Sequence, residues 1–74
     1  MKTQVAFRKF PEGDLVALFV NEEWSPGYIS SYAHVGQHGG AHPELFDELE
    51  PATKEESAPL KAELTSIGYD LEEI

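Results

Sequence analysis

The three histidines of this chain, His34, His38 and His42, fall within nine residues. Imidazole binds metal ions, transfers protons and changes its charge near neutral pH. Three neutral imidazoles suit a zinc ion that keeps one coordination position open, and the glycines between them would let the backbone bend. We therefore expect one of two arrangements. The histidines form a zinc site with a structural or catalytic role, or they lie separately on a strand, a loop and a helix start.

Other kinds of catalytic site lack essential residues. The chain has no cysteine, which excludes a thiol nucleophile. His38-Gly39-Gly40 is similar to the oxyanion stretch of esterases, but their Gly-x-Ser-x-Gly motif is absent. The glycines from Gly36 to Gly40 lead toward a predicted helix, as in phosphate-binding loops, but the lysine of such loops is missing. The sequence therefore favours a protein that is not an enzyme.

The chain has a net charge of −9 at pH 7, and most of this negative charge lies in its second half. Residues 1–41 contain four acidic and three basic residues, whereas residues 42–74 contain ten acidic and two basic ones. Direct binding of nucleic acid needs a basic surface, so nucleic acid is not an expected ligand. The acidic half is either a solvated surface or a surface that contacts a basic protein. In the second case the chain is also suited to be an inhibitor that mimics nucleic acid.

The length of 74 residues predicts a single domain, 1–74. A domain this small has a thin stability margin and often gains stability from a metal ion or from self-association, so a homodimer is an expected state. The longest apolar run, from Leu15 to Val20, is far shorter than the roughly 20 residues of a membrane helix. The N-terminus does not have the pattern of a signal peptide. We expect a cytoplasmic protein that does not bind membranes.

Three segments of the first half have the pattern of β-strands. Thr3 to Phe10 and Tyr28 to Val35 alternate between apolar and polar residues, and Leu15 to Val20 is apolar throughout, as in a central strand. Residues 11–14 are predicted to form a turn and Asn21 to Gly27 a loop, because both segments contain proline and glycine. Short connections favour an antiparallel meander. The glycine-rich segment that follows is expected to be a loop.

A helix is predicted after Thr53, which forms a capping box with Glu56. Pro59 either kinks this helix or lies in the first turn of one that begins at Ser57. Gly68 is suited to end it. One apolar stripe of the helix consists of Leu60, Leu64 and Ile67.

A shorter helix is expected at residues 43–49, where a proline suits the first helical position. Residues 69–74 alternate again and suit a final strand beside the first or the third strand. The predicted fold class is therefore α+β, with the element order β-β-β-α-α-β. Both helices are expected on one face of the sheet.

Four segments spread over most of the chain carry a resemblance to known proteins. They are Phe7-Arg8-Lys9-Phe10, Val16-Ala17-Leu18-Phe19, Ser31-Tyr32-Ala33-His34-Val35-Gly36-Gln37-His38-Gly39, and the region from Ala58-Pro59-Leu60 to Ser66-Ile67-Gly68-Tyr69-Asp70-Leu71. The chain resembles a group of short uncharacterised bacterial proteins that are often found on phages and other mobile elements. Because that group has no established activity, the resemblance implies only a protein that binds or inhibits a component of the host.

Aromatic residues of the predicted sheet fall on one face. Alternation places Tyr28, Tyr32 and His34 together. The helices are expected to cover the opposite face, which holds Val5 and Phe7. An exposed apolar and aromatic patch is typical of an interface. We therefore predict a protein-interaction module without enzymatic activity. Its predicted binding surface consists of Trp24, Tyr28, Tyr32, His34 and His38.

Overall fold

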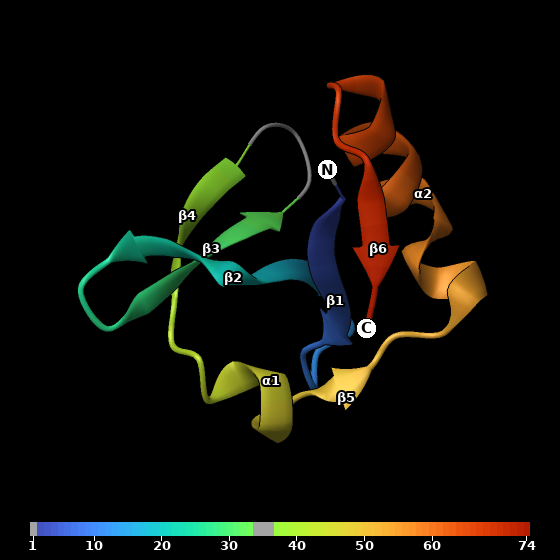
Figure 1. The fold of residues 1–74 in the computed structure, drawn as a ribbon. Coiled ribbons are helices and arrows are strands. Elements are labelled where there is room, and N and C mark those ends of the chain that lie inside the picture. Colours follow the sequence, from blue (N-terminus) through green and yellow to red (C-terminus); the bar gives the residue numbers. More distant parts are fainter. Residues whose placement is uncertain (1, 34–36) are drawn as a thin grey trace.

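The structure, a computed structural model, describes residues 2–33 and 37–74. Over these ranges a largely antiparallel sheet carries two helices (Figure 1). The elements are β1 (Thr3–Lys9), β2 (Leu15–Ser25), β3 (Tyr28–Ala33), β4 (Gln37–Ala41), α1 (Leu45–Glu48), β5 (Glu50–Pro51), α2 (Lys54–Ser66) and β6 (Leu71–Glu73). The strand order is β4-β3-β2-β1-β5, and β6 lies parallel to β1. No helix in the described part of the chain is long and apolar enough to cross a membrane.

The predicted α+β class is confirmed, and so is the meander of the first three strands. β1 pairs antiparallel with β2, and β2 pairs antiparallel with β3. The last strand, β6, returns to the edge of β1, which is one of the two positions expected for it. Its path places the C-terminal residues between β1 and α2 (Figure 1).

Two segments predicted as loops are strands. The glycine-rich segment forms β4, because its backbone pairs with β3 from Ala33 opposite Gln37 to Ile29 opposite Ala41. Pairing with a neighbour overrides the low strand propensity of glycine. β2 continues to Ser25, because register shifts between Phe19 and Glu23 and again before Ser25 let it stay paired with β3. β5 is also additional to the predicted order.

One face of the sheet packs against α2. Phe7 lies opposite Ala17, and Ala17 lies opposite Tyr32, so the three side chains share this face. Tyr32 was predicted on the other face. Because strand side chains alternate with a period of two, the face of every residue in β3 depends on register, which the sequence pattern did not fix. The buried cluster consists of Val5, Phe7, Ala17, Phe19, Tyr32, Leu60 and Leu64.

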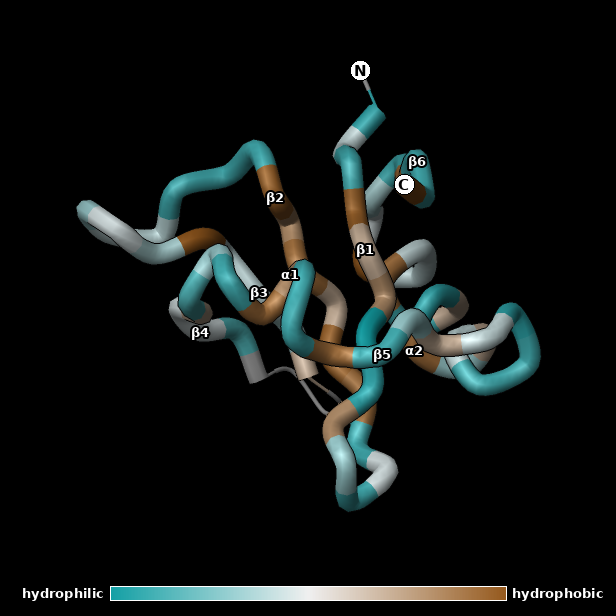
Figure 2. The backbone as a smooth tube through the Cα atoms, turned by 90° about the horizontal axis from the view of Figure 1, so that it is seen from below, coloured by the Kyte–Doolittle hydropathy of each residue, from teal (hydrophilic) through white to brown (hydrophobic). Residues whose placement is uncertain are grey.

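The opposite face packs against α1, so the prediction that both helices share one face is wrong. Ala6, Val16, Leu18 and Ala41 form the buried cluster there, and the partly buried side chains packed on it include Ile29, Leu45 and Phe46. The physical reason lies in β2, whose first half is apolar on both faces and needs cover on both. Figure 2 shows the hydrophobic residues of β1 and β2 in the middle of the molecule, with α1 in front of them.

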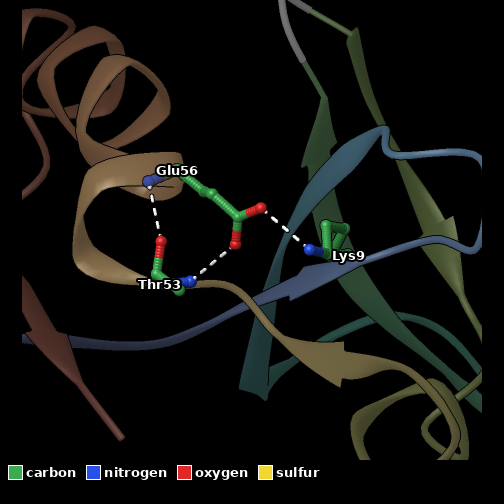
Figure 3. Close-up of polar contacts among 3 residues, drawn as sticks. All are labelled: Lys9, Thr53 and Glu56. Atoms are coloured by element: carbon green, nitrogen blue, oxygen red, sulfur yellow. Dashed lines mark hydrogen bonds and ion pairs between the residues drawn. The ribbon is translucent and has the colours of Figure 1, made fainter.

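The start of α2 is fixed by the predicted capping box and by an ion pair to β1 (Figure 3). The Glu56 backbone N–H donates to Thr53 Oγ1 at 3.1 Å, and the Thr53 backbone N–H donates to Glu56 Oε1 at 3.0 Å. The second oxygen of Glu56 accepts from Lys9 Nζ at 2.8 Å. α2 continues through Pro59 and does not begin again at Ser57.

The end of α2 is a glycine turn that sets the position of Tyr69. Gly68 has a φ of 113°, which favours glycine. Its N–H donates to the Thr65 carbonyl at 3.1 Å, and the Tyr69 N–H donates to the Leu64 carbonyl at 3.2 Å. These are the two bonds of a Schellman motif. Leu60 and Leu64 of the predicted stripe are buried, but Ile67 is 53% exposed because it lies in this turn, beyond the helix.

Candidate functional site

An indole ring lies over a glycine in the middle of β4. Gly40 pairs with Ser30 of β3, and neither residue has a side chain that fills the space above the sheet. Trp24, near the end of β2, lies in this space. A methyl group on Gly40 would come within 2.6 Å of Trp24 Cδ1 and 3.2 Å of its Nε1. Trp24 is nevertheless 53% exposed. The sheet therefore supports one edge of the indole and leaves the rest to solvent.

Two tyrosine–histidine pairs flank the indole on the same face. His38 and His42 stand two residues before and after Gly40, so alternation directs all three positions to one face. The ring of His38 meets the edge of Tyr32, with 4.6 Å between the centroids. The ring of His42 lies 4.9 Å from that of Tyr28. Tyr28 and both histidines are exposed.

Tyr69 extends this group of rings toward α2. Its ring stacks on Phe19, with 5.2 Å between the centroids and 15° between the planes. Its hydroxyl lies 3.4 Å from Nε2 of His38. Beside these two residues and the Gly68 turn is an open pocket of about 310 Å³. We call the following residues the aromatic row: Trp24, Tyr28, His38, His42 and Tyr69.

The aromatic row has carboxylates at its ends and no cation on its strands. Residues 10–53, which contain β2, β3 and β4, include no lysine or arginine. Glu22 and Glu23 precede Trp24 and are exposed. Asp70 follows Tyr69 and is exposed as well. A positively charged group that approaches the row therefore meets carboxylates and ring faces and no repelling charge.

The basic residues of the chain are mostly engaged within it. Three of the five, Arg8, Lys9 and Lys61, have partners on other elements: a backbone carbonyl of α1 for the arginine and carboxylates for the lysines. By contrast, every acidic residue except Glu56 and Glu63 is exposed. The charge that the surface offers to another molecule is thus negative.

The structure brings together three members of the predicted binding surface, Trp24, Tyr28 and His38. Tyr32 lies directly opposite His38 in the β3–β4 pair and is only 2% exposed. It belongs to the core under α2, and its hydroxyl donates to the carboxylate of Glu63. Its ring thus packs against His38 from the neighbouring strand. The remaining member, His34, lies outside the described residues.

His42 and Tyr69 complete the aromatic row and were not predicted as part of the binding surface. His42 was assigned to a helix start, although the spacing His38-x-Gly40-x-His42 has the period of a strand. That spacing is the signal that identifies it. Tyr69 is far away in sequence, and only the packing of α2 on the sheet brings it to His38.

The histidines do not converge where they are described. His38 and His42 are separated by four residues of extended backbone, which corresponds to about 13 Å. Each ring contacts a different tyrosine. Within residues 2–33 and 37–74, no group of three or more histidine, aspartate or glutamate side chains is arranged to hold a metal ion. A site with all three histidines would also need His34, which lies outside those ranges.

The ion pair between Lys9 and Glu56 borders an open cleft of about 670 Å³, which Glu12, Glu48 and Glu50 also line. The hydrogen bond and charge of Glu56 raise the pKa of Lys9, and the hydrogen bond from Lys9 lowers the pKa of Glu56. Both groups therefore stay charged near neutral pH. A general acid or base needs a pKa near the working pH, so this pair attaches α2 to β1 and is not suited to proton transfer.

Comparisons with known proteins identify no family and no function for this site. The sequence matches no model of a protein family, and neither the curated proteins nor the solved structures contain a match. The resemblance to bacterial proteins of mobile elements therefore stays a prediction, and the function must be argued from the site.

Proposed function

We propose that this chain is a protein-interaction module without enzymatic activity, which binds a basic segment of another protein through the aromatic row. The observation that carries the proposal is the position of Trp24. Its indole rests on Gly40 between Tyr28 and His38 and is 53% exposed. Burial of a tryptophan normally stabilises a small core. A sheet that supports this ring without covering it is suited to bury it against a partner.

The composition of the row fits a protein partner. Tryptophan and tyrosine are enriched at the centres of interfaces and dominate their energetics. A rigid ring also loses little conformational freedom on binding. Here the buried rings of Tyr32 and Phe19 pack against His38 and Tyr69. The row is therefore preorganised, which lowers the cost of association.

The charge of the surface selects a basic partner. Exposed carboxylates adjoin Trp24 and Tyr69 in the sequence, the rings of the row attract cations through their faces, and residues 10–53 have no lysine or arginine. Net charge of −9 also steers basic molecules toward the chain and repels a second copy of it. A basic protein segment is thus favoured over a homodimer, which is the alternative state for the same surface.

A selection from a random library of 12-residue peptides tests the proposal, with Trp24→Ala as the test variant. Ile74→Ala is the matched control, because Ile74 is 49% exposed but lies beside Val20 and Phe46 on the α1 face, away from the aromatic row. We expect the wild type and Ile74→Ala to enrich peptides of positive charge. Trp24→Ala should bind those peptides at least about 30-fold more weakly, as expected for an interface hot spot worth ~2 kcal/mol.

Two results would overturn the proposal. One is the absence of enrichment by the wild type. The other is enrichment that Trp24→Ala leaves intact, which would place binding elsewhere on the chain. Light scattering measures the molecular mass of the wild type at high concentration and shows separately whether it forms a homodimer. A stable dimer that Trp24→Ala dissociates would assign the row to self-association instead of a basic partner.

A further inference from the structure

β4 leaves one backbone edge unpaired in the part of the chain that the structure describes. It stands at the end of the strand order and pairs only with β3. An antiparallel edge strand directs alternate N–H and C=O groups outward, where they can pair with another strand. With five residues, Gln37–Ala41, β4 is long enough to bind an extended segment.

The other edges of the sheet carry features that discourage such pairing. β5 has two residues, one of which is Pro51, and proline cannot donate to a ladder. β6 has three residues, and two of them, Glu72 and Glu73, are acidic. Short strands, prolines and charges are the usual protections of edges. The sequence of β4, Gln-His-Gly-Gly-Ala, has no proline and no lysine, arginine, aspartate or glutamate.

The open edge lies directly beside the aromatic row. His38 and His42 project from β4 and its continuation, and Trp24 covers Gly40 between them. A strand added to this edge would lie about 4.8 Å beyond β4. Its alternate side chains would then stand next to the row, and basic ones could lie against the ring of Trp24. At Gly39 and Gly40 the backbone of β4 carries no side chain of its own.

We infer that the basic partner binds as an added β-strand on the edge of β4, with every second side chain over the aromatic row. This inference rests on the proposed function and specifies how the same surface works. Strand addition draws affinity from main-chain hydrogen bonds and specificity from alternate side chains. The charge of the chain favours a basic extended segment over a second copy of β4, because two copies would bring together two net charges of −9.

Complementary backbone methylation of a bound peptide tests the inference without any change to the protein. Two versions of one library-selected basic peptide are made, N-methylated at odd or at even positions. In a strand, only one of the two sets of N–H groups faces β4. We expect one version to lose binding at least tenfold and the other to retain it within about threefold. Alternate amides of Gln37–Ala41 should exchange hydrogen more slowly when the unmodified peptide is bound.

The outcomes separate this inference from the proposed function. If both methylated versions bind equally, or both lose binding, while Trp24→Ala still abolishes binding of the unmodified peptide, strand addition is wrong and the aromatic row stands. Unchanged exchange of the β4 amides on peptide binding would have the same meaning. If the library yields no peptide at all, both proposals fall together.

Discussion

At the level of single residues, Gly39 and Gly40 are neighbours with different roles. Trp24 lies against Gly40, and a methyl group there would meet the indole at 2.6 Å. At Gly39 the same group would meet nothing within 4 Å. Both positions lie in β4, but alternation directs their Cβ positions to opposite faces of the sheet. The same substitution at the two positions therefore compares a site that lies against Trp24 with one that is clear of it.

Gly40→Ala should displace the indole, and Gly39→Ala should leave it in place. A methyl carbon at residue 40 would lie too close to Cδ1 of Trp24 for both groups to keep their positions. Its three nearest atoms all belong to the five-membered ring of the indole. Because Trp24 is the single tryptophan, its fluorescence reports the change directly. We expect a red shift and stronger quenching by iodide for Gly40→Ala only. Equal spectra for the two variants would show that Trp24 does not rest on Gly40.

Tyr32 is a structural residue, and its hydroxyl should contribute to stability. It donates to the carboxylate of Glu63 from a position that is 2% exposed. Loss of a hydrogen bond to a charged group costs about 1.5–3 kcal/mol. Because Glu63 is only partly buried and can be hydrated, we expect Tyr32→Phe to lose about 1.5 kcal/mol in urea denaturation. Tyr28→Phe, at a tyrosine that is 41% exposed, should lose almost nothing. Similar values for the two variants would contradict this assignment.

The ion pair of Lys9 and Glu56 predicts a dependence of stability on pH. The pKa of Glu56 lies below its ordinary value of 4.5, so its contribution is present above pH 4.5 and is lost as the pH falls through the lowered pKa. The pKa of Lys9 lies above 10.5, so its contribution is lost only as the pH rises through that raised value.

Melting temperatures of the wild type and Glu56→Gln between pH 3 and 8 check this dependence. Glutamine keeps the capping box but removes the charge. The wild type should be more stable by a constant margin above pH 4.5, and the margin should shrink in acid. Glu55→Gln, at the exposed neighbouring position, should show no such margin. A margin that grows below pH 4.5 would contradict a lowered pKa of Glu56.

At the level of elements, the sequence predicted those helix ends and strands that are determined by short segments of the chain. The capping box at Thr53, the glycine at the end of α2 and the strands β1 to β3 are features of short segments. β4 was missed because its formation depends on pairing with β3 and not on its own residues. Tyr32 was assigned to the wrong face because register is set across two hairpins and the irregular part of β2.

The turn at Gly68 is the element that brings Tyr69 to the aromatic row, and it predicts a simple stability change. Gly68 has a φ of 113° and open space around its Cα. Gly68→Ala therefore acts through backbone strain alone and should cost about 1 kcal/mol in thermal or urea unfolding. Gly68→Asn should cost less, because asparagine adopts this conformation more readily. An alanine variant as stable as the wild type would mean that the turn is not as described.

At the level of the whole molecule, packing on both faces of the sheet explains the shape of the site. α1 and α2 cover opposite faces, and α2 packs on buried side chains of β1 and β2 and on Tyr32 of β3. The aromatic row lies on this face as well, where Trp24, His38 and Gly40 are exposed. The sequence predicted three of the row's five residues, Tyr28 from strand alternation and Trp24 and His38 as loop residues beside the predicted sheet face. The other two depend on β4 and on the contact between α2 and the sheet.

We propose the aromatic row as a binding surface for basic protein segments, and the emission of Trp24 reports on that surface without any added label. A library-selected basic peptide without tryptophan is titrated into the wild-type chain at constant ionic strength. We predict a saturable blue shift, because the partner removes water from an indole that is 53% exposed in the free chain. Binding of the peptide with no change in the emission of Trp24 would contradict the account.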